Sequence, residues 1–446
     1  MCECSNCGEW YHLKCLDLGP AERKSARAAA SNQTNVSTWV CPGCMMPDGT
    51  PNQGRLHSAC FSLSEVFEGM GIATYALCIL VSEGRVRPFR KLWACEWDES
   101  AQQLSIELGK KLPLQLALCQ FRDFKKLFSA ATPAATDLGV VSFPCCRFSR
   151  QVSASRTAKD LRDGETMSLM MQLLKCVRQQ LWQVILVENV MPFYSSDAWE
   201  EFMTCAGQHG YSLHKVLVIN SMDVAQPQSR ERGFAVLSLA SVATAGIDIQ
   251  CLFEQQKRIH LDSLTSQGAR RTLEEYILSD TEHAGLGLTA DLMAQFSIHQ
   301  LEAIKLSAYL QTKGISMDQA AQEWYVIDLN NSPDWLNINR HGCAPTLTAA
   351  HSMRSLFVTH HSVNRFLTPF EHLLLMGCDM CQLHAAADAL LRVPSHGKRV
   401  RGLRAIGKIA GNAICVSVAK VVLQTLSCFF PNIFLHQQSP QANTLL

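Results

Sequence analysis

The sequence predicts an α/β protein built on a Rossmann-like sheet, with a cysteine-rich segment at its N-terminus. Two observations predict the sheet. Short apolar runs, such as residues 140–143, end abruptly, and another run leads through a glycine turn at Gly69 and Gly71 into an apolar stretch. Such runs are typical of strands that are buried on both faces of a parallel sheet. The third observation is that the cysteines of residues 1–50 occur in pairs, which is typical of metal sites.

The composition is that of a globular protein. The chain has 446 residues, of which 47% are hydrophobic and 18% are charged, and this excludes a disordered chain. Its formal net charge is +1, so binding to a polyanion must come from local basic patches. Twenty cysteines without an N-terminal signal segment predict a reducing compartment. Apolar runs such as residues 76–81 are too short to cross a bilayer, so no membrane partner is expected.

Paired cysteine and histidine residues mark the N-terminal segment. In each pair two residues separate the ligands, so both side chains can reach one tetrahedral zinc ion from a tight turn. Three such pairs within residues 4–44 would rarely arise by chance. The candidate Zn2+ ligands are Cys4, Cys7, His12, Cys15, Cys41 and Cys44.

The order of these ligands around Trp10 resembles the plant homeodomain (PHD) finger. The resemblance implies two interleaved zinc sites. His12 and Cys15 would belong to the site whose first ligand pair lies upstream of the chain, so residues 1–47 would form a partial finger and residues 48–57 a linker. It also implies a nuclear location and a histone-tail partner, with Trp10 in an aromatic cage that makes cation–π contacts. A purely structural zinc knuckle and a partly unfolded arm are the alternatives.

A strand end, a glycine turn and a helix start follow one another over residues 65–77. Gly69 and Gly71 let the backbone approach a ligand without a Cβ atom in the way. A second apolar run ends at Glu96, which is placed to accept hydrogen bonds from ribose hydroxyls, and Trp97 offers a flat face for an adenine ring. This order predicts a nucleoside cofactor at the edge of a Rossmann-like sheet.

The apolar run of residues 140–143 ends in Pro144 and Cys145. A buried strand of a parallel sheet would deliver this thiol to the loop at its C-terminal end, where open α/β sheets place their chemistry. Cys145 is therefore a candidate nucleophile if its surroundings favour the thiolate. A buried structural cysteine is the alternative for the motif alone.

Together these segments resemble the ordered motifs of the C5-cytosine-specific DNA methyltransferases. The glycine turn, the Glu-Trp-Asp of residues 96–98 and the Phe-Pro-Cys of residues 143–145 resemble motifs I, II and IV. The later motifs follow in the family's order: Glu188-Asn189-Val190, Pro227-Gln228-Ser229-Arg230-Glu231-Arg232, Ala344–Thr348, Arg365–Glu371 and Gly411–Ala413. The resemblance runs from about residue 60 to 425, and so many motifs in order form a specific signal.

The resemblance implies methyl transfer from S-adenosylmethionine to C5 of a cytosine that is flipped out of double-stranded DNA. Cys145 would add to C6 of the ring, and Glu188 would hydrogen-bond the N3 and N4 edge of the base. Arg232 would contact the cytosine O2 atom, and Arg230 would hold the loop and the site. The cofactor-binding residues that the motifs imply are Phe67, Gly69, Gly71, Glu96, Trp97, Pro144 and Asn412.

The resemblance also divides the chain. Residues 58–239 would form the catalytic core, residues 240–338 a target-recognition insert, residues 339–431 the returning core elements and residues 432–446 a disordered tail. The predicted fold class is thus a Rossmann-like S-adenosylmethionine-dependent methyltransferase sheet, with a small target-recognition insert and an N-terminal zinc-binding segment.

At several positions the sequence differs from the family pattern. Glu65 stands where aspartate is usual, Ile72 replaces a glycine, and Cys146 follows the nucleophile in place of glutamine. Two alternatives stay open. One is the tRNA-directed branch of the same family, which shares the catalytic motifs. The other is a chromatin-binding module that keeps the methyltransferase shell with weak turnover, which the altered cofactor motif favours.

Overall fold

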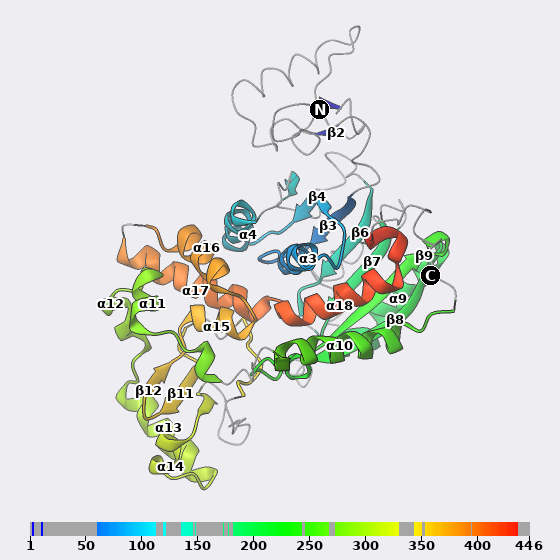
Figure 1. The fold of residues 1–446 in the computed structure, drawn as a ribbon. Helices are drawn as coiled ribbons and strands as arrows, with labels where there is room; N and C mark the ends of the chain where they lie inside the picture. The colour runs from blue at the N-terminus through cyan, green and yellow to red at the C-terminus, as the bar shows by residue number, and fades with distance from the viewer. Residues whose placement is uncertain are drawn as a thin grey trace.

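A mostly parallel sheet of seven strands forms the centre of the protein (Figure 1). The computed structural model describes residues 2–3, 10–11, 60–112, 119–121, 135–145, 148, 173, 177, 182–242, 246–266, 273–329, 343–349, 353–393 and 395–435. The strands are β3 (Phe61–Val66), β4 (Phe89–Cys95), β5 (Cys119–Phe121), β6 (Thr136–Ser142), β7 (Trp182–Asn189), β8 (Tyr211–Asn220) and β9 (Glu231–Leu239).

The strand order in space is β5-β4-β3-β6-β7-β9-β8. The first five strands are parallel, and β9 runs antiparallel to both β7 and β8. Numbered along the chain, the first five strands have the order 3-2-1-4-5 that is shared by Rossmann-like sheets. The prediction of a mixed α/β fold with a parallel-rich sheet is therefore confirmed.

Both faces of the sheet are buried, which explains the continuous apolar runs of its strands. Val140 and Leu186 point into one core, and their neighbours Val141 and Val187 point into the other. Successive residues of a strand lie on opposite faces, so each face needs its own apolar set. The first core includes residues of α3 (Ile72–Ser82), α4 (Glu99–Lys111), α10 (Ile249–Ser266) and α18 (Val416–Phe429), and the second includes residues of α9 (Asp197–Gln208).

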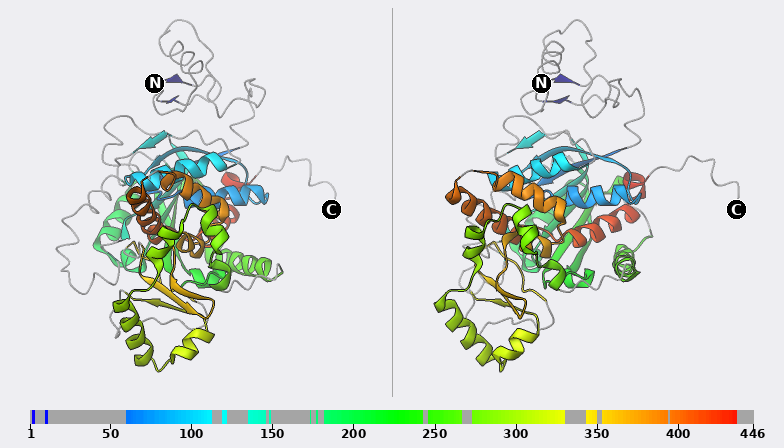
Figure 2. Two further views of the ribbon diagram at one scale, coloured as in Figure 1. Left: turned by 90° about the vertical axis from the view of Figure 1, so that its left-hand side faces the viewer. Right: turned by 60° about the vertical axis from the view of Figure 1, so that its left-hand side comes forward.

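A smaller lobe projects from the sheet, at the bottom of both views in Figure 2. Its antiparallel sheet has the order β10-β11-β12, and the predicted boundary at residues 338 and 339 falls between the paired strands β10 and β11. The elements of this lobe are β10 (Tyr325–Asp328), β11 (Leu356–His360), β12 (Val363–Phe366), α11 (Asp280–Gly285), α12 (Ala290–Met293), α13 (Gln300–Thr312), α14 (Met317–Gln322) and the short 3-10 helices η7 (Leu273–Tyr276) and η8 (Ala294–Phe296).

The C-terminal part of the chain returns from the lobe to the core. Here α15 packs on α17, α16 on α4, and α18 on α3. Residues 396–429 are long and apolar enough to cross a membrane, but they form two helices and 78% of their apolar window is buried in the protein. Their apolar side chains therefore belong to the core. The helices are α15 (Pro369–Leu375), α16 (Met380–Leu390), α17 (His396–Asn412) and α19 (Pro431–Phe434).

The folded chain extends further than the sequence predicts. Residues 432–435 fall in the predicted disordered tail, but α19 includes Phe434, which is fully buried. Its ring packs edge-on against Phe61 at a centroid distance of 4.9 Å. This contact to the first core strand orders the segment, while residues 436–446 lie outside the described part of the chain.

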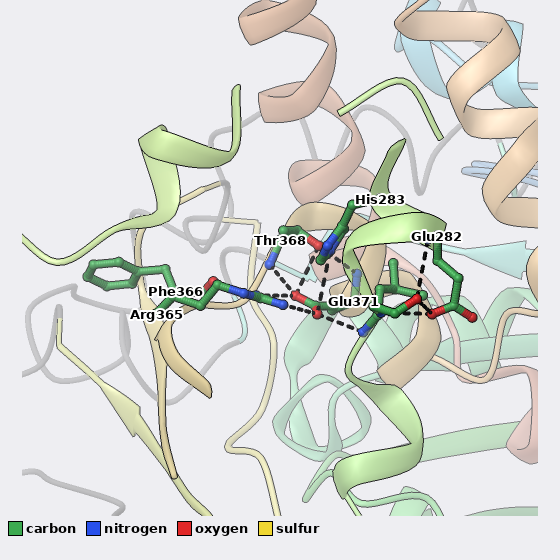
Figure 3. Close-up of polar contacts among 8 residues, drawn as sticks. Glu282, His283, Arg365, Phe366, Thr368 and Glu371 are labelled. Carbon is green, nitrogen blue, oxygen red and sulfur yellow. Dashed lines mark hydrogen bonds and ion pairs between the residues drawn. The ribbon is translucent and has the colours of Figure 1, made fainter. Parts of the chain in front are cut away.

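A buried carboxylate fastens the smaller lobe to the returning helices. Glu371 is fully buried, and Arg365 donates to its two oxygens at 2.8 and 2.7 Å (Figure 3). The backbone N–H groups of Thr368 and Leu278 donate to it at 2.7 and 3.0 Å, and the Thr368 hydroxyl donates at 3.0 Å. His283 Nε2 lies 3.7 Å from the same carboxylate. One side chain thus joins β12, α11 and the start of α15.

Candidate active site

The side chains predicted to carry chemistry gather at the carboxyl edge of the parallel strands. Phe67 follows β3, Glu96 follows β4, Cys145 follows β6, and Glu188 is the next-to-last residue of β7. Because β9 runs antiparallel to β7, its start lies at the same edge and brings Arg232 there. Ligands of open α/β sheets bind at this edge.

The turn after β3 is shaped by three residues with positive φ. The φ angle is 57° at Phe67, 58° at Gly69 and 76° at Gly71. Glycine adopts this conformation without the steric cost of a Cβ atom. Phe67 is held in it by its N–H group, which donates to the Cys95 carbonyl at 2.8 Å. The helix α3 begins at Ile72 without a side-chain cap from its N-cap residue Gly71, and the Glu65 carboxylate accepts from the Thr74 N–H in its first turn at 3.3 Å.

A pocket lies beside this turn and joins segments that are far apart in the sequence. Three of the predicted cofactor-binding residues line it: Phe67, Gly69 and Asn412. Ser142, at the end of β6, lines it as well. Gly71, Glu96, Trp97 and Pro144 lie at the same edge but outside this lining.

Glu96 is positioned by two backbone amides. Its Oε2 atom accepts from the Gly69 N–H at 2.9 Å, and its Oε1 atom accepts from the Asp98 N–H at 2.8 Å. Burial raises the pKa of Glu96 to about 7, against the lowering effect of these two hydrogen bonds. Each carboxylate oxygen can accept more than one hydrogen bond, so Glu96 still offers acceptors to a ribose.

Trp97 is exposed over 67% of its surface, so its flat ring is accessible for stacking. Lys408 Nζ lies 5.4 Å from the Trp97 ring centroid and pairs with Asp98 at 2.8 Å. The lysine on α17 therefore already covers one face of the indole, which leaves the other face for a ring.

The predicted catalytic residues form one electrostatic group. Arg232 Nε lies 3.1 Å from Glu188 Oε1, and both side chains are largely buried. Burial raises the pKa of Glu188, while the charges of Arg232 and Arg230 act in the opposite direction. Arg230 interacts electrostatically with Glu188 and with Cys145, which is half-buried at the start of its loop. The four residues are thus brought together.

Arg230 connects three segments around the site. It donates to the carbonyl oxygens of Leu347 at 2.6 Å, Ala413 at 2.9 Å and Gly411 at 3.2 Å. Its buried Nε atom has no hydrogen-bond partner in the described part of the chain. Burial lowers its pKa to about 9, which leaves it protonated at neutral pH. A Cβ atom on Gly411 would lie 2.2 Å from the Thr348 backbone, so only glycine permits this approach.

Sequence reasoning missed several residues of this region. Glu65 and Glu68 line the pocket, and Lys91 forms ion pairs with both of them. Both acids precede the glycines of the turn and Lys91 lies in β4, but no local pattern in the sequence shows that the three side chains meet. Gln228 was quoted only as part of a motif, yet it is fully buried and its amide has no hydrogen-bond partner within the described residues. Such a group costs free energy until it gains a partner.

The predicted zinc ligands are not tested by the structure. Cys4, Cys7, His12, Cys15, Cys41 and Cys44 lie outside the described residues. Two short strands, β1 (Cys2–Glu3) and β2 (Trp10–Tyr11), pair antiparallel on either side of the first cysteine pair. Over the part of the chain that the structure describes, no three His, Cys, Asp or Glu residues are grouped to hold a metal ion.

The sheet order, the glycine turn and the strand-end carboxylate define an α/β enzyme of the class that binds a nucleoside cofactor. The sequence profile of the C-5 cytosine-specific DNA methylase family matches residues 61–428. This chain therefore belongs to that family of methyltransferases, and the prediction of the family is confirmed. The family implies S-adenosylmethionine as the cofactor.

Two solved structures show the same fold. The chain is similar to the Dnmt2 methyltransferase of S. pombe, with a TM-score of 0.53, 16% identity, and coverage of 82% of this chain and 98% of that chain. It is also similar to the Entamoeba histolytica methyltransferase EhMeth, with a TM-score of 0.52, 12% identity, and coverage of 82% and 98%. No curated protein matches the chain.

The residues at the sheet edge fit S-adenosylmethionine. A Cβ atom added to Gly69 would meet no atom within 4 Å, so the turn leaves open space at the pocket. The Glu96 carboxylate and the exposed Trp97 ring supply a hydrogen-bond acceptor and a flat apolar face. These are the groups that a ribose and an adenine require.

Proposed function

We propose that this protein transfers a methyl group from S-adenosylmethionine to C5 of cytosine in double-stranded DNA. The observation that carries the proposal is the convergence of Cys145, Glu188, Arg230 and Arg232 at one sheet edge, beside the pocket of the glycine turn. The four residues come from three separate segments of the chain. Inside a duplex C6 of the base is out of reach of a thiol, so the enzyme flips the base out.

Cys145 acts as the nucleophile. Its thiolate adds to C6 of the cytosine, which makes C5 electron-rich enough to accept a methyl group. The bound cofactor supplies that methyl group from a positively charged sulfonium. Loss of the C5 proton and elimination of Cys145 then restore the aromatic ring. The nearby guanidinium of Arg230 favours the thiolate over the thiol.

Glu188 and Arg232 hold the base. The buried carboxyl of Glu188 hydrogen-bonds the N3 and N4 edge of the cytosine, and its raised pKa favours sharing a proton with N3. The ion pair with Arg232 fixes the orientation of this carboxyl. Arg232 donates to the O2 atom of the base, while Arg230 holds the surrounding segments through its bonds to Leu347 and Ala413.

The test is a methyl-transfer assay with radiolabelled S-adenosylmethionine. Purified protein is incubated separately with unmethylated DNA, hemimethylated DNA and tRNA, and Cys145→Ala serves as the control. We expect label on DNA that is lost in the Cys145→Ala protein. Label on tRNA alone would replace the DNA proposal with the tRNA-directed branch. No label on any substrate would contradict the proposed activity and favour a binding module.

We further propose that residues 1–47 form a partial PHD-type zinc finger that binds a histone tail in the nucleus. The ligand spacing supports this proposal, as does the pairing of β1 with β2 around the first cysteine pair. The test is the zinc content of the purified chain before and after Cys41→Ser and Cys44→Ser substitution. We expect bound zinc to fall and binding to histone-tail peptides to be lost with it. A chain that contains no zinc would contradict the proposal.

A further inference from the structure

Two buried carboxylates share one ammonium group behind the glycine turn. Lys91 Nζ lies 2.6 Å from Glu65 Oε2, and it also pairs directly with Glu68. The side chains of the three residues are between 0% and 3% exposed. Two carboxylates and one ammonium leave a formal charge of −1 in the interior. The Thr74 N–H and hydroxyl both donate to Glu65, which stabilises its carboxylate but leaves the formal charge unchanged.

The cluster lies directly under the cofactor pocket. Glu65 and Glu68 both line the pocket. A Cβ atom built on Gly71 would lie 3.7 Å from Glu68 Oε2 and 3.8 Å from Lys91 Nζ, so the glycine turn passes over the ion pair at van der Waals distance. The charges therefore lie at the wall of the pocket and directly behind the glycine turn.

The carboxyl group of Glu96 interacts electrostatically with the same cluster. Glu68 is one of the charges that raise the pKa of Glu96, after the dominant effect of burial. Burial alone would lower the pKa of Lys91, but the charges of Glu65 and Glu68 outweigh it and raise the pKa. Lys91 is therefore a permanent cation, and the excess of carboxylates around it makes the floor of the pocket negative.

We propose that the cluster of Glu65, Glu68 and Lys91 makes this site selective for the positively charged S-adenosylmethionine over its product S-adenosylhomocysteine. The inference rests on the proposed function, since it concerns the same pocket. The two ligands share the adenosine and amino acid groups and differ by the methyl group and the positive charge on sulfur. Salt screens a buried negative charge only weakly. Such a charge attracts the positively charged sulfur of S-adenosylmethionine and has no such attraction for the neutral sulfur of S-adenosylhomocysteine. Loss of the charge on methyl transfer then weakens binding of the product.

The test is the affinity of the full chain for each of the two ligands, measured by isothermal titration calorimetry. Glu68→Gln makes the cluster neutral, because Lys91 keeps its pair with Glu65. We expect Kd for S-adenosylmethionine to rise roughly tenfold and Kd for S-adenosylhomocysteine to change by less than about twofold. Glu68→Asp, which keeps the charge, should restore the ratio of the two affinities.

Two further variants serve as a control for a remote carboxylate and as a substitute for Glu68→Gln. Glu302→Gln removes a carboxylate from α13 in the smaller lobe, and both affinities should stay at the wild-type values. If Glu68→Gln does not fold, Glu65→Gln removes the same charge from the other side of Lys91. Equal losses of affinity for both ligands, in a folded variant, would overturn the selectivity and leave the proposed function intact. A wild-type chain that binds neither ligand would overturn both.

Discussion

This protein buries carboxylate groups in two clusters, and the two clusters differ in how the carboxylate charge is compensated. In the smaller lobe, Glu371 receives five hydrogen bonds, two of them from Arg365, so one charge is fully compensated. At the cofactor pocket, Glu65 and Glu68 share the cation of Lys91, and Glu65 also accepts from the N–H and hydroxyl of Thr74. Two carboxylates therefore pair with one cation. A carboxylate with all its hydrogen bonds made mainly stabilises the packing of the segments around it. A cluster with more carboxylates than cations keeps a negative electrostatic potential that can act on a ligand. The difference predicts distinct responses to substitution.

The largest effect is expected in the saturated cluster. Arg365→Met leaves the Glu371 charge buried without its main partner, and we expect a loss of about 3–5 kcal/mol in the free energy of unfolding. Urea denaturation checks this value. The matched control is Arg392→Met, which removes an exposed ion pair with Asp388 on α16 and should cost less than about 0.5 kcal/mol. Equal losses in the free energy of unfolding for the two variants would show that the Glu371 cluster does not hold the smaller lobe to the returning helices.

Lys91→Met should have the next largest effect and a characteristic pH dependence. It leaves two carboxylates buried side by side, which should cost about 2–4 kcal/mol at pH 8. The carboxylates would then bind a proton more readily in the folded state than in the unfolded state, so stability is regained as the pH falls. We therefore expect the loss to be smaller at pH 5.5 than at pH 8 in thermal or urea unfolding. A loss of stability that is the same at both pH values would contradict the description of Glu65 and Glu68 as two carboxylates that share Lys91.

The wild-type protein should lose stability on acidification through the Glu371 cluster. Burial lowers the pKa of His283, although Glu371 acts in the opposite direction. The unfolded state therefore binds the proton first, and stability falls as the pH drops below about 6.5. Burial opposes ionisation of Glu371, but Arg365 outweighs it and lowers its pKa, so this contribution is lost at still lower pH. Melting temperatures between pH 7.5 and 5 check the first step, and measurements continued down to about pH 3 check the second, because an unfolded glutamate binds its proton at about pH 4.3. His283→Gln should remove the first step.

The smallest effect on stability is expected for Glu68→Gln. Lys91 keeps the carboxylate of Glu65, and the glutamine oxygen can still accept a hydrogen bond from it, so the cost should be about 1 kcal/mol. The same substitution should have the clear effect on cofactor selectivity described above. A cost as large as that of Lys91→Met would show that Glu68 is needed mainly for folding.

The positions of the strand ends at this edge could be predicted from the local sequence. Gly69, Gly71, Glu96 and Cys145 each follow a strand that the apolar runs mark, and the structure places all of them at one sheet edge. Both the glycine turn and the strand ends depend on residues within a few positions of one another. Such features can be read from a single sequence.

The cluster under the pocket could not be predicted in this way. Lys91 meets Glu68 across 23 positions of the chain, on the neighbouring strand. The pairing of β3 with β4 also shifts register between Leu63 and Ser64, which changes the residues that face each other. Likewise Arg230 binds carbonyl oxygens 117 to 183 positions away. These contacts follow from the packing of whole elements and not from any local pattern.

The most direct test of the account is whether Cys145 forms a covalent bond to a cytosine. A duplex that carries 5-fluorocytosine holds a fluorine where the C5 proton must leave, so the adduct at C6 cannot be resolved. With S-adenosylmethionine present, the account predicts a protein–DNA complex that survives denaturing electrophoresis, and its absence in Cys145→Ser. No stable complex with the wild-type protein on either DNA or tRNA, or the same complex with Cys145→Ser, would contradict it.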